Sequence, residues 1–446
     1  MDLLAKADRR ALLIAAAIAM AVAAGVQGQS AVSTLSVDGR ANAHVSLAAE
    51  GGFVVAAWAA SLPSGVTDIY AAFSRNGGAT FTSPTRVNST PGDARINGEQ
   101  PPRVALASRT AGDPAVTVFW TSKGASGTTL LTARSNDGGR SFSSSTLVPG
   151  TDAPGNRGWQ AIADDRSGAL HAAWLDHREL AAQDTAKPAG GTHTHAGHAT
   201  SNTATAASAD TTDGVALAEH SELYLGILGG DAQHFPRPIT GGVCYCCKTA
   251  LATGASGTVF AAWRHVYPGN MRDIAFSMSA DGGRTYSRPV RVSEDQWQLN
   301  GCPDDGPAMV VDDRRRVHVV WPTVVVEKGE PVKALFHALS PDGKGFGTRT
   351  RVPTQGFGHH PQLALAPDGS IAVVWDEVVG GTRHIGLARG IVDRSGRIAM
   401  VRQQFGAGNG EVGVYPVVAP AGDHVLVAWT SNTGSQSTIR LMRRRM

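Results

Sequence analysis

The sequence predicts an all-β fold, a β-propeller of seven four-stranded blades, from three observations. A short apolar run that ends in Trp occurs seven times along the 446 residues. The composition is rich in turn formers, with 53 Gly and 23 Pro, yet 42% of the residues are hydrophobic. The last repeat is one strand short, and the first residues after the leader can supply that strand. Together these features exclude a disordered chain and a helical bundle, and they make the length one repeat array.

The Trp-ended runs define the repeat unit. They recur at intervals of 54 to 62 residues, apart from one interval of 89, and they end at Trp58, Trp120, Trp174, Trp263, Trp321, Trp375 and Trp429. Runs of four to six Val, Ala and Trp residues bounded by Gly turns are typical of buried strands. One unit reads as a strand (QLALA), a turn (PDGS), the Trp strand, a third strand (HIGLA) and a fourth strand. Four strands per repeat is the pattern of a propeller blade.

The two ends of the chain are expected to share the last blade. From Tyr415 to Met446 there is room for three strands only, so we expect residues near Ser33 to Val37 to add the fourth and close the ring. Closure leaves no open sheet edge. We therefore expect one domain over 29-446, with a disordered insertion at about 178-218. That insertion accounts for the long interval and contains His193, His195 and His198.

A second repeated pattern occupies the turn before the fourth strand in four of the repeats. It reads Ser-x-Asp/Asn-Gly-Gly-x-Ser/Thr-aromatic and starts at Ser74, Ser135 and Ser279, with a shortened copy at Ser340. The Asp or Asn can accept hydrogen bonds from its own turn, and Gly permits positive φ. These turns resemble the Asp-box, or BNR, repeats of the sialidase superfamily. Because sialidase catalytic domains have six blades, a six-bladed ring is the alternative that this resemblance implies.

The first 28 residues resemble an export signal. Lys6, Arg9 and Arg10 precede an apolar run from Ala11 to Ala24, and small residues follow. The paired Arg also resemble a twin-arginine signal. We expect a periplasmic or extracellular protein without a membrane span in its mature form, because no later segment reaches 18 apolar residues. The net charge of +3 comes from scattered basic residues, which argues against nucleic acid as a partner.

The unusual polar residues fall on loops that open at one axial mouth of the predicted ring. All four cysteines lie there, with two histidines from the next blade: Cys244, Cys246, Cys247, Cys302, His359 and His360. Sulfur and imidazole ligands suit copper or zinc. In an exported protein the same cysteines also suit disulfides. A bridge inside the triplet would be strained, so one disulfide with two free thiols, or a thiolate metal site, fits better than two bridges.

The cysteine segments also resemble, as a group, exported bacterial proteins that are described as sialidase-like because of their repeats. The resemblance rests on C-x-C-C at Cys244, on the segment from Trp263 to Ile274, and on N-G-C-P at Asn300. On the same mouth, Arg157, Arg264, Arg272 and Asp273 could bind an anion. The alternative for the last three is an Arg to Asp ion pair that braces the loop.

The superfamily resemblance implies a second function, that of an exo-α-sialidase or related glycoside hydrolase. Such an enzyme would hold a sugar carboxylate with several Arg and use a Tyr nucleophile. The matching residues are Tyr415, Arg103, Arg264 and Arg383, with Arg157 as a further clamp candidate. The Arg-Ile-Pro signature of the family is absent, and only Pro102-Arg103-Val104 approaches it, so the catalytic set is in doubt. A passive scaffold that binds a protein or a glycan is the third hypothesis.

Overall fold

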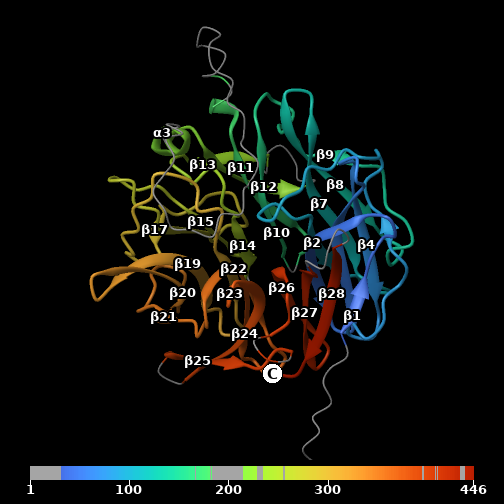
Figure 1. Ribbon diagram of the computed structural model, residues 1–446. Helices are drawn as coiled ribbons and strands as arrows, with labels where there is room; N and C mark the ends of the chain where they lie inside the picture. The colour runs from blue at the N-terminus through green and yellow to red at the C-terminus, as the bar shows by residue number, and fades with distance from the viewer. Residues whose placement is uncertain are drawn as a thin grey trace, which may run out of the picture.

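Each Trp-ended run forms the second strand of a four-stranded antiparallel sheet in the computed structural model (Figure 1). The structure describes residues 32–165, 167–180, 182, 214–228, 235–254, 257–393, 396–406, 408, 410–431 and 437–446. The predicted export signal, 1-28, lies outside these residues, as does most of the insertion, including its three histidines. The prediction of seven four-stranded blades is confirmed.

The blades are numbered along the chain, and each begins with its innermost strand. Blade 1 consists of β2 (Ala41–Glu50), β3 (Phe53–Ser61), β4 (Thr67–Ser74) and β5 (Thr85–Arg86). Blade 2 consists of β6 (Arg103–Ala107), β7 (Ala115–Gly124), β8 (Gly127–Ser135) and β9 (Thr146–Leu147). Blade 3 consists of β10 (Arg157–Asp164), β11 (Leu170–Asp176), β12 (Glu222–Leu228) and β13 (Arg237–Thr240). Blade 4 consists of β14 (Ala250–Thr253), β15 (Val259–Arg264), β16 (Ile274–Ser279) and β17 (Val290–Arg291). Blade 5 consists of β18 (Ala308–Val311), β19 (Val317–Glu327), β20 (Glu330–Ser340) and β21 (Thr350–Arg351). Blade 6 consists of β22 (Phe357–Leu365), β23 (Ile371–Val379), β24 (Thr382–Val392) and β25 (Ile398–Gln403). Blade 7 consists of β26 (Val414–Ala421), β27 (His424–Ser431), β28 (Thr438–Arg444) and β1 (Ser33–Leu35). A short helix, α3 (Gly214–Glu219), precedes β12.

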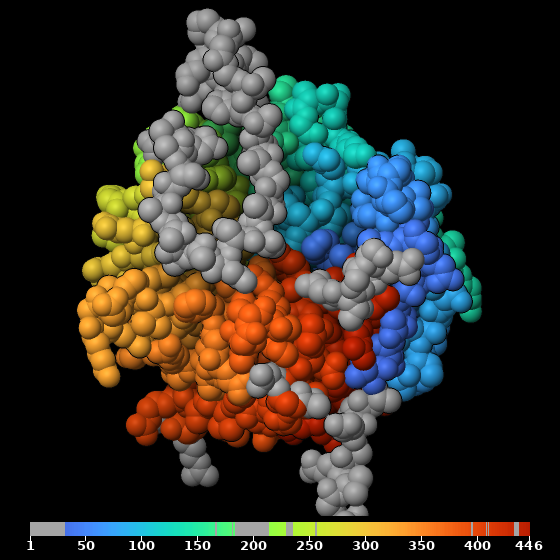
Figure 2. All heavy atoms as spheres, viewed as in Figure 1, coloured from blue at the N-terminus to red at the C-terminus, as the bar shows by residue number. Residues whose placement is uncertain are grey.

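The innermost strands form a closed ring. Each first strand contacts the first strand of the next blade, and β26 of the last blade contacts β2 of the first. In Figure 1 the labels β2, β10, β14, β22 and β26 lie around the middle of the ring, whereas β17, β21 and β25 lie at its periphery. Figure 2 shows the blades following one another around the same face in chain order, from blue to red. The central axis is therefore lined by residues of every blade.

The ring closes between the two ends of the chain, as the sequence predicts. Strand β1 pairs with β28 in antiparallel register, with Ser33 opposite Leu441 and Leu35 opposite Ile439. Blade 7 thus takes three strands from the C-terminal end and its outermost strand from the N-terminal end. This pairing covers the edge of β28 that would otherwise be open.

The Trp strands form the core between blades. All seven Trp side chains are buried, and the residues of each Trp strand alternate between two neighbouring blades. In β3, Trp58 and Ala56 pack with Leu426 of blade 7, whereas Val55 and Ala57 pack with Trp120 of blade 2. This two-sided burial explains why these strands are apolar at every position rather than at alternate ones.

The repeated Asp turns lie between the third and fourth strands, as expected. In blade 4, the Asp281 carboxylate accepts hydrogen bonds from Ser279 Oγ, Thr285 N and Thr285 Oγ1. The second Gly of the pattern has positive φ, and at Gly139 a Cβ would lie 2.2 Å from the Phe73 ring of the preceding blade. The turns are therefore structural and pack one blade against the next. No helix in the described ranges is long and apolar enough to span a membrane.

Candidate functional site

An irregularity recurs in the innermost strands at the central axis. Strands β2, β10, β22 and β26 each contain a register shift at a residue with positive φ, and these residues are His44 (60°), Trp159 (55°), His360 (49°) and Tyr415 (52°). A bulge of this kind bends the strand and redirects one side chain. Non-glycine residues in this backbone region are uncommon, and they concentrate at functional sites. Four blades thus present an aromatic or imidazole ring at equivalent positions.

Three of these rings form a row. The Tyr415 ring centroid lies 4.1 Å from that of His360 and 5.3 Å from that of His44. The three residues belong to blades 7, 6 and 1, which are neighbours around the ring. A phenol is therefore held between two imidazoles by three separate strands.

The row borders a pocket at the central axis. This axial pocket has about 280 Å³ of empty space, partly open to solvent, and its polar lining residues are His44, Glu99, Arg103, Lys248, His360, Gln362 and Tyr415. It combines two predicted site residues of the glycosidase hypothesis, Tyr415 and Arg103, with His360 of the metal hypothesis. Concave sites with a few convergent polar groups are the usual place for a ligand.

Arg103 supplies the pocket with an available cation. Its Nε donates a hydrogen bond to the Gln160 carbonyl at 2.8 Å, and its two terminal nitrogens have no protein partner among the described residues. Burial lowers the pKa of Arg103 to about 10, against the opposing effect of the Glu99 charge. Arg103 is therefore positively charged at neutral pH and can pair with an anion.

The Glu99 carboxylate joins three blades. Its buried carboxylate accepts hydrogen bonds from the backbone N–H groups of Lys248 (2.9 Å) and Gly306 (2.8 Å). The Lys248 ammonium lies 3.4 Å from the other carboxylate oxygen. These contacts join blades 2, 4 and 5 beneath the pocket. They compensate the negative charge of the carboxylate.

His360 is oriented by a buried carboxylate. Its Nδ1 donates to Asp376 Oδ1 at 2.7 Å, and Arg383 bonds the other oxygen of Asp376. The backbone N–H of His360 donates to Asp305 Oδ1 at 2.9 Å. Burial alone would lower the pKa of His360, but the charge and hydrogen bond of Asp376 outweigh burial and raise it. His360 therefore tends to hold a proton.

His44 has the opposite electrostatic environment. Burial lowers the pKa of His44 to about 4, and the nearby His360 contributes to the shift. Its Nδ1 is buried without a hydrogen-bond partner in the part of the chain that the structure describes. Burial and the charge of Glu99 raise the pKa of Tyr415. At neutral pH the row therefore consists of a neutral imidazole, a neutral phenol and an imidazole that favours protonation. Such separated pKa values are typical of an acid and base pair.

His359 lies beside the pocket in a second carboxylate contact. Its Nδ1 is 3.0 Å from Asp305 Oδ2 and 3.0 Å from Lys333 Nζ. His359 and the cysteines do not share a cluster. Within the described ranges, the groups that could hold a metal ion are Cys244–Cys246–Cys247, Cys246–Cys302–Asp304 and Glu99–Asp305–His360, and none combines Cys with His.

The cysteines form one disulfide and one thiol pair. Cys246 is bonded to Cys302, with their Cα atoms 6.1 Å apart, and the bridge links the loops that enter blades 4 and 5. Cys244 and Cys247 are free and buried, and the Cys247 thiol donates to Cys244 Sγ at 3.6 Å. Burial would raise the pKa of Cys244, but this hydrogen bond and the charges of Arg272 and Arg264 lower it to about 7. Of the arrangements open from sequence, the structure therefore has one bridge with two free thiols.

The remaining predicted anion-binding residues are buried among protein groups. Arg157 donates to the carbonyls of Ala153, Pro154 and Gly155 and pairs with Asp176. Arg264 donates to the carbonyls of Arg272, Asp305 and Pro322. Asp273 pairs with Arg291 at 3.2 Å rather than with either predicted Arg. These side chains brace the loops of the mouth, and they do not line the axial pocket.

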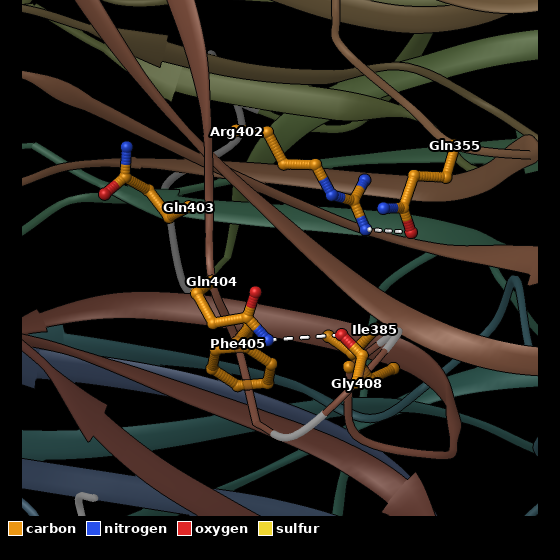
Figure 3. Close-up of a pocket in the computed structure, with 8 residues that line it drawn as sticks. Gln355, Ile385, Arg402, Gln403, Gln404, Phe405 and Gly408 are labelled. Carbon is orange, nitrogen blue, oxygen red and sulfur yellow. Dashed lines mark hydrogen bonds between the residues drawn. The ribbon is translucent and has the colours of Figure 1, made fainter.

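A second hollow lies away from the axis, beside the outermost strand of blade 6. Figure 3 shows Arg402 bonded to Gln355, and Gln404 bonded to the loop at Gly408. Arg402 also pairs with the buried Glu377 at 2.6 Å. The charged group of this hollow is thus already neutralised, and the axial pocket is the better candidate site.

Sequence reasoning placed Tyr415, Arg103 and His360 at the mouth but assigned no role to His44, Glu99, Lys248 or Asp376. One signal could have revealed two of these residues. In the four blades with the bulge, the bulged residue precedes the blade Trp by 14 or 15 residues, which selects His44 as well as His360 and Tyr415, and the same spacing in blade 4 falls on Lys248. Glu99 and Asp376 have no repeated position of this kind.

Comparison with known proteins supports the architecture. No protein-family model and no curated protein sequence matches the chain. Among solved structures, the GH93 α-L-arabinofuranosidase of Fusarium graminearum in complex with arabinobiose is 12% identical, with 94% of this chain and 98% of that chain covered and a TM-score of 0.50. Polysaccharide lyase Uly1 is 9% identical over 92% of this chain and 91% of its own, with a TM-score of 0.50. The intramolecular trans-sialidase from Ruminococcus gnavus is 12% identical over 79% of this chain and 94% of its own, with a TM-score of 0.45. At identities this low, the likeness to the arabinofuranosidase and to the polysaccharide lyase shows a shared fold.

Proposed function

We propose that the protein is an exported carbohydrate-active enzyme that binds an acidic sugar in the axial pocket and cleaves it by proton transfer. The observation that supports this proposal is the row His44–Tyr415–His360 beside the available guanidinium of Arg103. The arabinofuranosidase and the polysaccharide lyase, two proteins of similar fold, are named for action on glycans. We propose the same substrate class for this chain.

The charges of the pocket favour a carboxylated sugar. The two terminal nitrogens of Arg103 can bind both oxygens of a carboxylate, which is the geometry that guanidinium groups favour. Lys248 adds positive charge, but Glu99 compensates it. Arg103 is therefore the residue that would neutralise the substrate carboxylate.

The row is suited to β-elimination from a uronic acid. In this reaction a base removes the proton on the carbon next to the carboxylate, a C=C bond forms, and the glycosidic C–O bond breaks. The departing oxygen takes up a proton from an acid. Neutral His44 is the base that the structure favours, and Tyr415 with His360 behind it is the proton donor. Binding of the carboxylate by Arg103 makes the abstracted proton more acidic.

Hydrolysis of the sialidase type is supported less well. That mechanism needs an activated Tyr, whereas burial and Glu99 raise the pKa of Tyr415. It also needs several Arg around the sugar carboxylate, but Arg264 is bonded to three carbonyls and Arg383 to Asp376. Only Arg103 of the predicted clamp lines the axial pocket with Tyr415.

The test is a product assay on the full mature chain. The protein is incubated with uronate-containing polysaccharides and with a fluorogenic sialoside. Elimination gives an unsaturated product that absorbs ultraviolet light, whereas hydrolysis releases reducing sugar without this absorbance. We expect the unsaturated product, lost in Tyr415→Phe and Arg103→Ala but retained in the matched controls Tyr70→Phe and Arg109→Ala, which lie outside the axial pocket. Release of reducing sugar without the ultraviolet absorbance would replace β-elimination by hydrolysis as the mechanism. Binding of a glycan without turnover would favour the scaffold hypothesis.

We propose a second function, the binding of a soft metal ion, copper or zinc, through cysteine. It is supported by the two buried free thiols of Cys244 and Cys247 with their sulfurs 3.6 Å apart. Cys246 and Cys302 are unavailable while they are bridged, and His359 and His360 bond to carboxylates instead. Elemental analysis of protein exported by a native-like route tests this function. Absence of copper and zinc from protein with two free thiols would contradict it.

A further inference from the structure

Among the described residues, two buried arginines beside the thiol pair have no carboxylate to neutralise them. Arg264 and Arg272 are 1% and 0% exposed. In the described part of the chain neither forms an ion pair with Asp or Glu, and their partners are an amide oxygen, backbone carbonyls and Cys244 Sγ, which lies 3.4 Å from an Arg272 nitrogen. Arg264 Nε is buried and has no hydrogen-bond partner in the described ranges. An uncompensated buried cation is costly, so this cluster favours an anion at the sulfurs.

The donor set next to these arginines contains only two sulfurs. Cys246 belongs to the same cluster but is bonded to Cys302. None of the described His, Asp or Glu residues joins Cys244 and Cys247 in a group of metal-binding size. Zinc in structural sites takes four ligands, and in catalytic sites three ligands with water. Two thiolates instead suit a monovalent soft ion such as Cu⁺.

The geometry and the charge both agree with a two-sulfur complex. With metal–sulfur bonds of about 2.3 Å, sulfurs 3.6 Å apart can both reach one ion. When Cu⁺ displaces both thiol protons, the complex of two thiolates and one monovalent ion has a charge of −1. A divalent ion with the same ligands would be neutral and would leave both arginines uncompensated.

We infer that Cys244 and Cys247 bind one Cu⁺ as an anionic bis-thiolate complex, whose single negative charge compensates that of Arg272, the arginine bonded to Cys244 Sγ. This inference rests on the second proposed function and narrows it from a soft metal ion to a monovalent one. The site lies one residue from the axial pocket, because Lys248 follows Cys247. It shares no ligand with that pocket.

The experiment is an anaerobic competition titration of the full mature chain with a colorimetric Cu⁺ chelator. We expect one Cu⁺ per chain in the wild-type protein and in the control variant Cys246→Ser/Cys302→Ser, which lacks the bridge but keeps both thiols. Cys244→Ser and Cys247→Ser should each weaken binding at least 100-fold. Arg272→Gln should weaken it at least tenfold, since it removes charge and no ligand. Unchanged affinity in Cys244→Ser/Cys247→Ser would overturn the inference.

A parallel titration with Zn²⁺ separates this inference from the function on which it rests. If Zn²⁺ binds to the two thiols and Cu⁺ does not, the monovalent site is wrong while soft-metal binding stands. If neither ion is retained, both are wrong. Should the cysteine variants not fold, alkylation of the wild-type protein gives the answer: Cu⁺ must protect Cys244 and Cys247 from iodoacetamide, and equal labelling with and without Cu⁺ would overturn the site.

Discussion

His360 Nδ1 donates a hydrogen bond of 2.7 Å to Asp376 Oδ1, and this contact orients the imidazole that lies against Tyr415. His360 is on the innermost strand and Asp376 on the neighbouring strand of the same blade, directly after Trp375. Because Asp376 is fully buried and also bonds Arg383, it serves both the stability and the protonation of the site.

Replacement of this carboxylate should therefore affect stability and activity together. We expect Asp376→Asn to lower the free energy of unfolding by about 3 to 5 kcal/mol, the range for removing one partner of a buried ion pair. The pKa of Asp376 is lowered in the folded state, so its contribution is present above the ordinary carboxyl pKa of about 4 and is lost as pH falls through the folded value. Urea unfolding of both proteins between pH 3 and pH 8 checks this. A stability difference that does not shrink at the acid end would contradict the assignment.

Tyr415→Phe should abolish most of the activity while the fold is kept. The Phe ring preserves the packing between His44 and His360 and removes only the hydroxyl. Loss of a general acid costs roughly 10² to 10⁴ in rate, so we expect kcat to fall by at least 100-fold with KM little changed. Steady-state kinetics and thermal unfolding are measured side by side. A variant that is fully active would remove Tyr415 from the mechanism.

The base role of His44 predicts an acid limit on activity. Burial lowers the pKa of His44 to about 4, so the neutral, proton-accepting form dominates above that pH and is lost below it. We expect kcat/KM to fall as pH drops through about 4. His44→Asn should remove this dependence along with at least 99% of the activity, and Asn tolerates the positive φ of this position. A profile of the residual activity that keeps the same acid limit would assign it to another group.

The cysteine pairing predicts a definite alkylation pattern. Under denaturing, nonreducing conditions, iodoacetamide should label Cys244 and Cys247 but not Cys246 or Cys302. Peptide mass spectrometry reads the sites directly. The bridge spans a sequence separation of 56 residues, so loop-closure entropy predicts that Cys302→Ser lowers the free energy of unfolding by about 4 kcal/mol. Labelling of four cysteines, or of none, would contradict this pairing.

Substitution in a repeated turn should change stability alone. Asp281→Ala removes the acceptor for three hydrogen bonds in an exposed turn of blade 4, for which a loss of about 1 kcal/mol is typical of a capping side chain. Activity at the axial pocket should stay within twofold of the wild-type value. A large loss of activity in a folded Asp281→Ala protein would mean that this turn contributes to the site.

The blades were predictable because their signals are local. A Trp strand packed on both sides must be apolar throughout, and a turn that needs two Gly with positive φ leaves a readable pattern, so each unit can be recognised from about 55 residues. The ring closure followed from one missing strand. These inferences needed no knowledge of long-range contacts.

The chemistry of the mouth was predictable only in part. Loop order placed Tyr415, Arg103 and His360 near the axis, but the choice between a free Arg and a structural Arg depends on carbonyl groups far away in sequence. Arg264, for example, is bonded to the carbonyl of Pro322 in the next blade, whereas Arg103 keeps two nitrogens free. The opposite pKa shifts of His44 and His360 likewise arise from burial and from Asp376, which no spacing rule discloses.

The pairing of β1 with β28 determines when blade 7 can fold during synthesis of the chain. Strand β1 pairs with residues more than 400 positions later in the chain, so the sheet of blade 7 forms only after β28 has been synthesised. Until then the edge of β28 and the first and last core clusters stay uncovered, and an interrupted chain would expose them to other proteins. Completion of the ring is therefore the step that joins seven separate sheets around a single shared axis.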